Sequence, residues 1–327
     1  MTIKDIAKEA GVSAAAVSRY FNGGSLGKEK QNKIREIVEK YNYVPNQTAQ
    51  SMRTGKSGQI GVIVPKIHSD SLSQIMHGIA DELEKMDYTM ILGCAEGKTE
   101  REVNYIETMQ KNRMEGIILM GTVMTPYLKD AIDHCKIPLV VTGQSFDGVP
   151  CVYYDDFNAM KDIAALVFKK RKKVAYIGVM DEDVAVGKNR RLGVLKAAEE
   201  AGLNPDDIIT VESGFNMEES LVVSRELVSS HPEIDGVICA TDSIAHGAML
   251  AVKESGKRVP EDVSITGVGN TLADIVSEPQ LSTVQLYFEQ CGRTAVGLIE
   301  DMISGNKKTS VISTIMLGYD IIERGSV

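Results

Sequence analysis

The sequence predicts an α/β protein with a small helical head over residues 1–45, followed by two lobes that each contain a doubly wound parallel sheet. Three observations lead to this prediction. The chain opens with two short helical segments, its first 56 residues are basic while the remainder is acidic, and short apolar runs alternate with helix-length segments from Gln59 onward. With 327 residues, 43% of them hydrophobic, the chain can fill about two or three domain cores.

The head is predicted to form two helices joined by a tight turn. Thr2 and Asp5 have the spacing of a capping box, so the first helix begins after Thr2. Gly11 tolerates the positive φ that ends such a helix, and Ser13 can cap a second helix over 14–21. Val17 and Phe21 then share the buried face of that second helix. In a helix-turn-helix motif the second helix enters the major groove of DNA.

Charge separates the head from the body. Residues 1–56 contain 10 Lys and Arg against 5 Asp and Glu, whereas the remaining residues contain 26 against 40. A cationic head attracts a polyanion, and an acidic body repels it. We therefore expect the head to bind nucleic acid, with a helical protein-interaction module as the alternative reading of the same helix pair.

The body is predicted to consist of βα units. Seven apolar runs have the character of strands buried on both faces, as in parallel sheets; they are 60–64, 90–94, 117–120, 139–142, 174–179, 237–240 and 264–268. Helix-length segments separate them, including 72–86, 187–201 and 217–230, and a last strand is expected over 315–322. So many units favour two lobes with a cleft between them, and a ligand at the carboxyl ends of the strands.

Composition and motifs argue against several classes of protein. The five cysteines are scattered without CxxC spacing, which favours a reducing cytoplasm over a disulfide framework or a zinc site. The first twenty residues are charged where a signal peptide is apolar, and no apolar run is long enough for a membrane helix. No P-loop, HExxH or GxSxG motif is present, so we expect no cofactor, metal or catalytic residue. A sugar-converting enzyme would depend on the adjacent carboxylates Asp155 and Asp156.

The pattern I-x-D-I-A-x-x-A-G-V-S-x-x-x-V-S-R-x-x-N over residues 3–22 resembles the opening signature of the lactose-repressor/galactose-repressor (LacI/GalR) family of bacterial transcription factors. The resemblance continues through 43–46 and 49–53, which look like the hinge helix of the family, and over the rest of the chain. It implies that these residues bind DNA: Thr2, Ser13, Ala14, Ala15, Ser18, Arg19, Asn22, Asn46, Ala49 and Met52.

The roles within this set follow from chemistry as well as resemblance. The hydroxyls of Ser13 and Ser18 and the amide of Asn22 can contact phosphates, the Arg19 fork fits a guanine edge, and the Met52 thioether can enter the minor groove. Ala14 and Ala15 depart from the usual polar residues. Methyl groups contact only thymine methyls, so base readout would depend on Arg19 and on DNA shape.

The resemblance also implies the domain organisation. A helix-turn-helix head (1–45) and a hinge helix with linker (46–58) precede a core (59–327) that looks like the periplasmic sugar-binding-protein fold. The N-lobe would take about 59–155 and 288–313, and the C-lobe about 157–286 and 315–327. The chain would cross between the lobes near 155–156, near 286–287 and near Thr314.

A sugar-sized effector is expected in the cleft between the lobes. Arg190 matches the arginine that clamps the effector in this family, and Phe215 and Phe288 match aromatic positions of the cleft. The full expected set is Ser71, Gln144, Arg190, Phe215, Asp242, Asn270 and Phe288. Asn270 replaces a frequent Asp, which leaves the identity of the sugar open, and Lys188 and Arg191 beside Arg190 leave room for a phosphorylated sugar.

The resemblance thus implies a cytoplasmic homodimer that binds pseudo-palindromic operator DNA and represses a carbohydrate-utilisation operon, controlled by a sugar or sugar-phosphate effector. One alternative is a carbon-catabolite-type global regulator with a protein corepressor. An alternative of another class is a sugar-binding receptor protein, against which the charged N-terminus argues.

Overall fold

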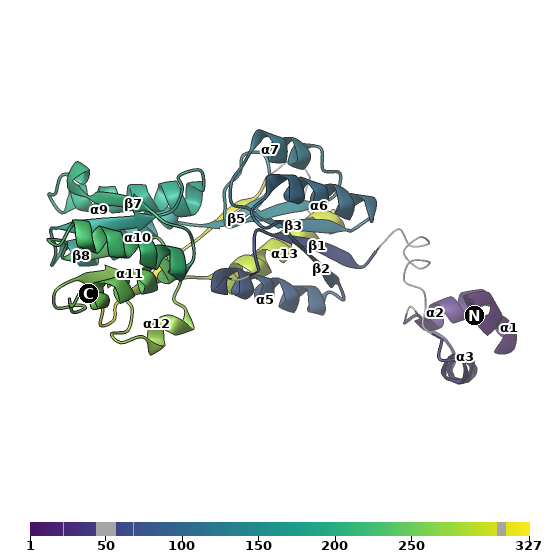
Figure 1. The fold of residues 1–327 in the computed structure, drawn as a ribbon. Helices are drawn as coiled ribbons and strands as arrows, with labels where there is room; N and C mark the ends of the chain where they lie inside the picture. Colours follow the sequence, from purple (N-terminus) through teal and green to yellow (C-terminus); the bar gives the residue numbers. More distant parts are fainter. Residues whose placement is uncertain (22, 44–56, 68, 306–311) are drawn as a thin grey trace. The chain divides into compact units, whose positions relative to one another are not determined.

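The computed structural model describes residues 1–21, 23–43, 57–67, 69–305 and 312–327, and it contains the predicted helical head and doubly wound lobes (Figure 1). The chain forms two compact units, residues 1–58 and residues 59–327. None of the helices in the described residues is long and apolar enough to cross a membrane.

The first unit contains the predicted helix pair. Helix α1 (Ile3–Glu9) begins with the Thr2–Asp5 capping box, and Gly11 has a φ of 63° at the turn. The Ser13 hydroxyl accepts a hydrogen bond from the Ala16 amide at 3.2 Å and so caps α2 (Ala14–Phe21). These features confirm the predicted start of the head.

A third helix, α3 (Lys28–Lys40), completes the head and was not predicted. Its Ile34 packs with Ile6 of α1 and Val17 of α2, and all three side chains are fully buried. The spacing of Ile34, Ile37 and Val38 could have revealed this helix, because these positions share one helical face. Three helices around one small core hold α2 with its opposite face exposed.

The N-lobe is built on a six-stranded parallel sheet in the order β11-β5-β4-β3-β1-β2. Its strands are β1 (Gln59–Val64), β2 (Thr89–Cys94), β3 (Gly116–Met120), β4 (Leu139–Thr142), β5 (Cys151–Tyr154) and β11 (Thr314–Leu317). Helices α5 (Asp70–Lys85) and α13 (Phe288–Ser304) pack together on one face, and α6 (Thr99–Lys111) and α7 (Pro126–Asp133) cover the other (Figure 1). Every residue of β3 and β4 is buried, as expected for a sheet covered on both faces.

The C-lobe contains a four-stranded parallel sheet in the order β7-β6-β8-β9 and an antiparallel pair, β10 with β12. The strands are β6 (Val174–Gly178), β7 (Ile209–Glu212), β8 (Gly236–Cys239), β9 (Ser264–Thr266), β10 (Thr283–Leu286) and β12 (Tyr319–Ile322). Its α-helices are α8 (Asp156–Phe168), α9 (Arg190–Glu200), α10 (Met217–Ser230), α11 (Asp242–Glu254) and α12 (Leu272–Val276). Helix α8 packs against α9, and α10 packs against α11.

The end of the chain differs from the prediction. The single strand expected over 315–322 is two strands, β11 and β12, which lie on either side of Gly318 and belong to different sheets. Because Thr314–Leu317 pairs in parallel with Cys151–Tyr154, these four residues belong to the N-lobe sheet. The third crossing therefore follows Leu317 and does not occur near Thr314.

The predicted helix over 187–201 also differs. A π-helical turn over Val184–Asn189 precedes α9, which begins at Arg190. A side chain at Gly187 would clash with the Met180 carbonyl, since an added Cβ would lie 2.0 Å from that oxygen. Close packing at Gly187 and the π turn together place Arg190 at the cleft, and π turns of this kind are frequent at functional sites.

Candidate functional site

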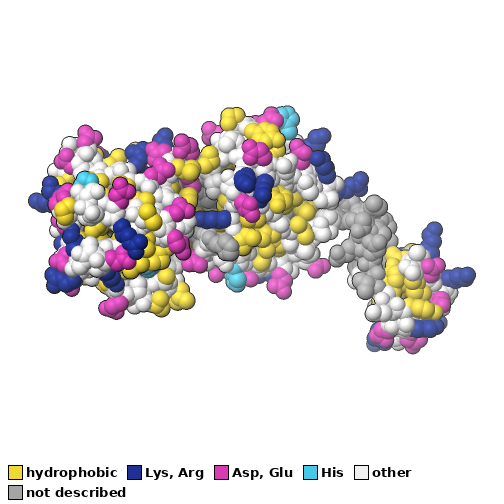
Figure 2. Space-filling model, in the orientation of Figure 1, with side chains coloured by type: hydrophobic (Ala, Val, Ile, Leu, Met, Phe, Trp, Pro, Cys, Tyr) yellow, Lys and Arg dark blue, Asp and Glu magenta, His cyan; other side chains and the backbone are white. Residues whose placement is uncertain are grey.

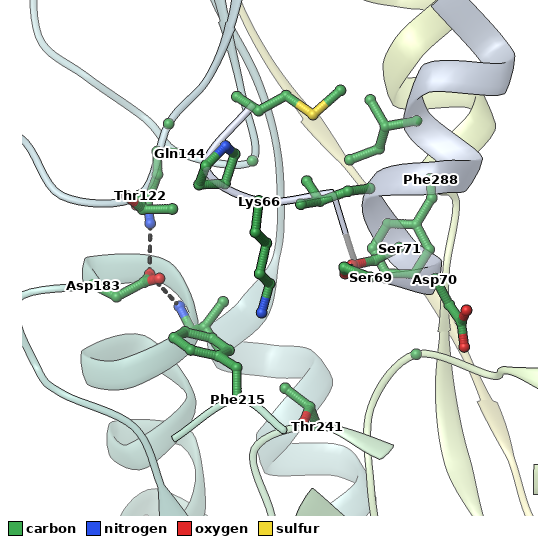
Figure 3. A pocket seen from close by; sticks show the side chains of 18 of the residues that line it. Lys66, Ser69, Asp70, Ser71, Thr122, Gln144, Asp183, Phe215, Thr241 and Phe288 are labelled. Carbon is green, nitrogen blue, oxygen red and sulfur yellow. Dashed lines mark hydrogen bonds between the residues drawn. The ribbon is translucent and has the colours of Figure 1, made fainter. Parts of the chain in front are cut away.

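A cavity of about 670 Å³ lies between the two lobes, a size typical of small-molecule sites. Its walls come from residues that follow the parallel strands, among them Lys66 after β1, Gln144 after β4, Met180 after β6 and Thr241 after β8. Figure 3 shows these walls from close by. The predicted position of the ligand site, at the carboxyl ends of the strands, agrees with this geometry.

Six of the seven expected effector residues line the cavity: Ser71, Gln144, Arg190, Phe215, Asp242 and Phe288. Asn270 is not among the residues that line it. The Asn270 amide donates to Gln285 Oε1 at 2.5 Å, and its oxygen accepts from Arg324 at 2.5 Å. With a φ of 54°, Asn270 turns its side chain into the C-lobe, where it joins the turn to β10.

Arg190 forms a buried pair with Asp156. Its Nε donates to Asp156 Oδ1 at 2.7 Å, its Nη2 lies 2.6 Å from the same oxygen, and its Nη1 donates to the Ala240 carbonyl at 2.5 Å. Burial raises the pKa of the Asp156 carboxyl, and the Arg190 charge opposes that rise. The guanidinium is therefore held rigidly at the cavity wall with its charge matched by Asp156.

The other two cations of this segment do not reach the cavity. Arg191 pairs with Asp181, at 3.0 Å between Nε and Oδ1, and Lys188 is exposed. Neither residue is among those that line the cavity. The phosphate-binding role considered for Lys188 and Arg191 has no support in the geometry.

Gln144 connects the two lobes. Its Nε2 donates to Asp183 Oδ1 at 2.6 Å, and its Oε1 accepts from the Ala185 amide at 3.2 Å. Both Gln144 and Asp183 are buried, and burial raises the pKa of the Asp183 carboxyl. The amide of Gln144 is thus engaged with the C-lobe, although we expected it to contact the effector.

Lys66 also spans the cavity. It extends from the loop after β1 toward Phe215 of the C-lobe (Figure 3), and its Nζ lies 4.6 Å from the centroid of the Phe215 ring. Burial lowers the pKa of Lys66, while the negative charges of Glu219 and Asp183 oppose that change. The ring face that was expected to carry a sugar is therefore covered by an ammonium group.

Two further polar groups complete the walls. Asp242 accepts a hydrogen bond from Thr283 Oγ1 at 2.5 Å, and burial beside the Asp274 carboxyl raises the pKa of Asp242 well above its ordinary value. The buried hydroxyl of Thr142 has no hydrogen-bond partner among the described residues. Thr142 can therefore bond a ligand hydroxyl without losing another contact.

Lys66, Thr142 and Asp183 were not predicted as site residues, and Asp156 was considered only for the hinge and for a catalytic pair with Asp155. Each of these residues ends or closely follows an apolar run that is a buried parallel strand. Polar residues at such positions meet at one edge of a sheet, so a search of every strand end would have found them. The carboxylates Asp155 and Asp156 are not a free catalytic pair, since Asp155 caps α8 and Asp156 holds Arg190.

The head presents the expected surface for DNA. Ala14, Ala15 and Arg19 are exposed on α2, and Ser18 is half-buried beside them. Thr2 and Ser13 are exposed but serve as helix caps. The remaining expected DNA contacts lie outside the described residues: Asn22, Asn46, Ala49 and Met52.

The lobes offer no comparable surface on the face seen in Figure 2, where Lys and Arg side chains alternate with Asp and Glu. Among the described residues, no cluster of three or more His, Cys, Asp or Glu side chains is arranged to hold a metal ion.

Two sequence families match the chain. Residues 2–46 match the family described as "Bacterial regulatory proteins, lacI family", and residues 163–327 match "Periplasmic binding protein-like domain". The second match covers half of the chain.

Curated relatives extend the similarity to nearly the whole length. The sucrose operon repressor of Staphylococcus xylosus is 30% identical over 302 residues, which cover 92% of this chain and 93% of that protein. Catabolite control protein A of Streptococcus mutans is 28% identical over 100% of this chain and 98% of its own. The solved lac repressor dimer, bound to operator and an anti-inducer, has the same fold, with a TM-score of 0.90 at 21% identity over 100% of this chain and 98% of that one.

Proposed function

Because the chain belongs to the lacI family of bacterial regulatory proteins, we propose that it represses a carbohydrate-utilisation operon and that a sugar or sugar derivative bound between its lobes controls its affinity for operator DNA. It is a DNA-binding transcriptional regulator and not an enzyme, as its curated relatives include the sucrose and ribose operon repressors. The proposal that a sugar binds between the lobes is supported by the interlobe cavity, which combines polar groups from both lobes with the aromatic residues Phe215 and Phe288.

The proposed operator contacts lie on α2. Arg19 would read a base edge, Ser13 and Ser18 would contact phosphates, and Ala14 and Ala15 would meet thymine methyls. A two-fold homodimer would present two copies of α2 to successive half-sites of a pseudo-palindromic operator. The segment 46–58 would act as the hinge helix, with Asn46, Ala49 and Met52 at the centre of the operator. We propose that this activity takes place in the cytoplasm.

The proposed control is a coupling between the cleft and the head. A ligand that prefers one arrangement of the lobes shifts the population of that arrangement and so changes operator affinity, with typical couplings of about 1–3 kcal/mol. Gln144 and Lys66 would couple the N-lobe to the C-lobe across the cavity, since the side chain of each contacts the opposite lobe directly.

A second candidate is a catabolite-type global regulator with a protein corepressor. The full-length similarity to catabolite control protein A favours it. Both candidates bind DNA, so they differ only in what controls that binding.

The experiment is thermal melting of the purified protein against mono- and disaccharides and their phosphates, followed by a mobility shift on its own upstream DNA. We expect one sugar to raise the melting temperature and to change the mobility shift. If no sugar raises the melting temperature while the DNA is still bound, the sugar-controlled repressor is wrong and the corepressor candidate replaces it.

A further inference from the structure

The cavity contains one cation that forms no ion pair with any carboxylate of the described residues, although Glu219 and Asp183 act on its charge from farther away. Two cationic side chains, Lys66 and Arg190, line it. Arg190 is neutralised by Asp156 at 2.6 Å, whereas no carboxylate in the described part of the chain lies within ion-pair distance of Lys66 Nζ. The ammonium lies over the face of the Phe215 ring, 4.6 Å from its centroid.

From this geometry we propose that the effector carries an anionic oxygen group, a carboxylate or a phosphate, and that Lys66 is the residue that binds it. The inference rests on the proposed function of the cavity as a sugar site and defines the chemical class of that sugar. Lys66 thereby becomes the residue that discriminates an anionic sugar from its neutral parent.

The position of Lys66 favours this role over a purely structural one. Its side chain crosses the cavity from the N-lobe and ends above Phe215 of the C-lobe, in the middle of the space that a ligand would fill (Figure 3). A neutral sugar would have to displace the ammonium from the ring without offering it a counterion. An anionic group gives the ammonium a stronger partner while it stays in the cavity.

The acidic residues of the cavity do not supply that partner. Asp70 and Glu96 are exposed at its mouth, and Glu96 already pairs with Arg101 at 2.5 Å. Asp183 accepts hydrogen bonds from Gln144 and from the Val186 amide.

Asp242 is buried, and burial beside Asp274 raises its pKa well above the ordinary value, so it is a poor counterion for Lys66. The single charge of the Lys66 ammonium therefore stays available to pair with a ligand anion. Since a carboxylate carries a single charge and a phosphate close to two at pH 7, the match is closer for a sugar acid.

Isothermal titration calorimetry on the full-length protein tests the proposal. The probes are glucose, galactose and mannose, each compared with its uronate and its 6-phosphate. For at least one parent sugar we expect an anionic derivative to bind at least tenfold more tightly than the neutral form, and we expect this preference to weaken as salt rises. A preference for the uronate or for the phosphate identifies which group Lys66 binds, and either supports the proposal.

Substitutions then assign the preference to Lys66. Lys66→Met keeps the length of the side chain without its charge and should reduce the preference to below twofold, while Lys66→Arg should retain it. Lys188→Met makes the same change on an exposed lysine outside the cavity and serves as the matched control. Circular dichroism of Lys66→Met, with Lys66→Arg as the conservative variant, separates loss of recognition from loss of folding.

Two results overturn the proposal while the proposed function stands: a neutral sugar that binds as tightly as its acid and phosphate, or an anion preference that survives Lys66→Met. A third result, no binding by any probe while DNA binding persists, overturns the sugar-effector function and this inference with it.

Discussion

Gln144 of the N-lobe donates a hydrogen bond to Asp183 of the C-lobe at 2.6 Å, and both side chains are buried. The same amide accepts from the Ala185 N–H, so one side chain ties the loop after β4 to the π turn that leads into Arg190. Any change in the angle between the lobes must stretch or break these bonds.

Gln144→Ala should loosen the connection between the lobes. Because it removes one of the two hydrogen bonds to the buried Asp183 carboxyl and leaves the one from the Val186 amide, we expect a loss of about 1–3 kcal/mol in the free energy of unfolding. We also expect the effector to change operator affinity less than in the wild type. Urea unfolding and operator titration with and without effector measure the two effects.

Gln290→Ala provides the control, since Gln290 is exposed and its side chain bonds to Thr294 on its own helix. It should change stability by less than about 0.5 kcal/mol. Equal effects of the two substitutions would show that Gln144 does not connect the lobes energetically.

Features that leave a local pattern in the sequence were predicted, whereas features that depend on tertiary packing were not. The strands with continuous apolar runs were predicted within one or two residues, because burial on both faces leaves a local signature in strands such as β4. Strands β5, β7 and β10 were missed, and of these β7 is a short edge strand whose burial alternates. The split at Gly318 could not be predicted, because it depends on which sheet each half joins.

The same distinction holds within the cleft. Arg190 could be placed at the cavity from its motif, and so could Phe215. Their partners could not, because the Asp156–Arg190 pair, the Gln144–Asp183 bond and the Lys66–Phe215 contact join residues 34 or more positions apart. Such contacts depend on tertiary packing. The strand ends therefore predicted where the cavity lies, but not which side chains within it pair with one another.

The Arg190–Asp156 pair gives a second prediction. Arg190→Gln leaves a buried carboxylate without its cation, which should cost about 3–5 kcal/mol of stability. Asp156→Asn in the Arg190→Gln background should restore part of that loss, because the uncompensated charge is gone. A double-mutant cycle by urea unfolding measures the coupling. Purely additive effects would contradict the pairing.

Helices α5 and α13 cross closely at Gly78 and Gly292. A Cβ at Gly292 would lie 2.2 Å from the Ile75 carbonyl, so Gly292→Ala must push the helices apart and should cost about 1–3 kcal/mol. Gly297 lies on the same helix with open space around its Cβ position. Gly297→Ala should therefore stabilise the protein by about 0.5–1 kcal/mol. Thermal unfolding compares the two, and effects of the same sign would contradict the packing described.

We expect the buried carboxyl of Glu102 to make the stability of the protein depend on pH. The side chain is buried on α6, and burial raises its pKa to about 7 from an ordinary value of 4.5. The folded state holds the Glu102 proton more tightly than the unfolded state. Protonation of Glu102 therefore contributes fully to the free energy of unfolding below about pH 4.5, and this contribution is lost as pH rises through 7. The loss is at most about 3 kcal/mol, and less where solvent screens the charge.

Glu102→Gln should remove this dependence. Compared with the wild type, the variant should gain stability at pH 8 relative to pH 5.5, as measured by urea unfolding at both values. If the difference between the two proteins is the same at both pH values, Glu102 does not titrate in this range.

For the head, we predict that Arg19 contributes to both the affinity and the specificity of operator binding. If it reads a base edge, Arg19→Ala should weaken operator binding by about 1–3 kcal/mol and relax the preference for the operator over unrelated DNA. Arg35→Ala removes the same charge from α3, where Arg35 is exposed and bonds to Asn32 of the same helix, and should leave the specificity ratio unchanged. Fluorescence anisotropy on both DNAs distinguishes the roles, and an unchanged ratio in Arg19→Ala would contradict base reading.

The most direct test of effector control is the dissociation constant for the operator with and without a sugar that raises the melting temperature, measured at fixed salt. We predict a change of at least about fivefold in either direction, the lower end of typical allosteric couplings. A sugar that stabilises the protein through the cleft but leaves operator affinity unchanged would contradict the account.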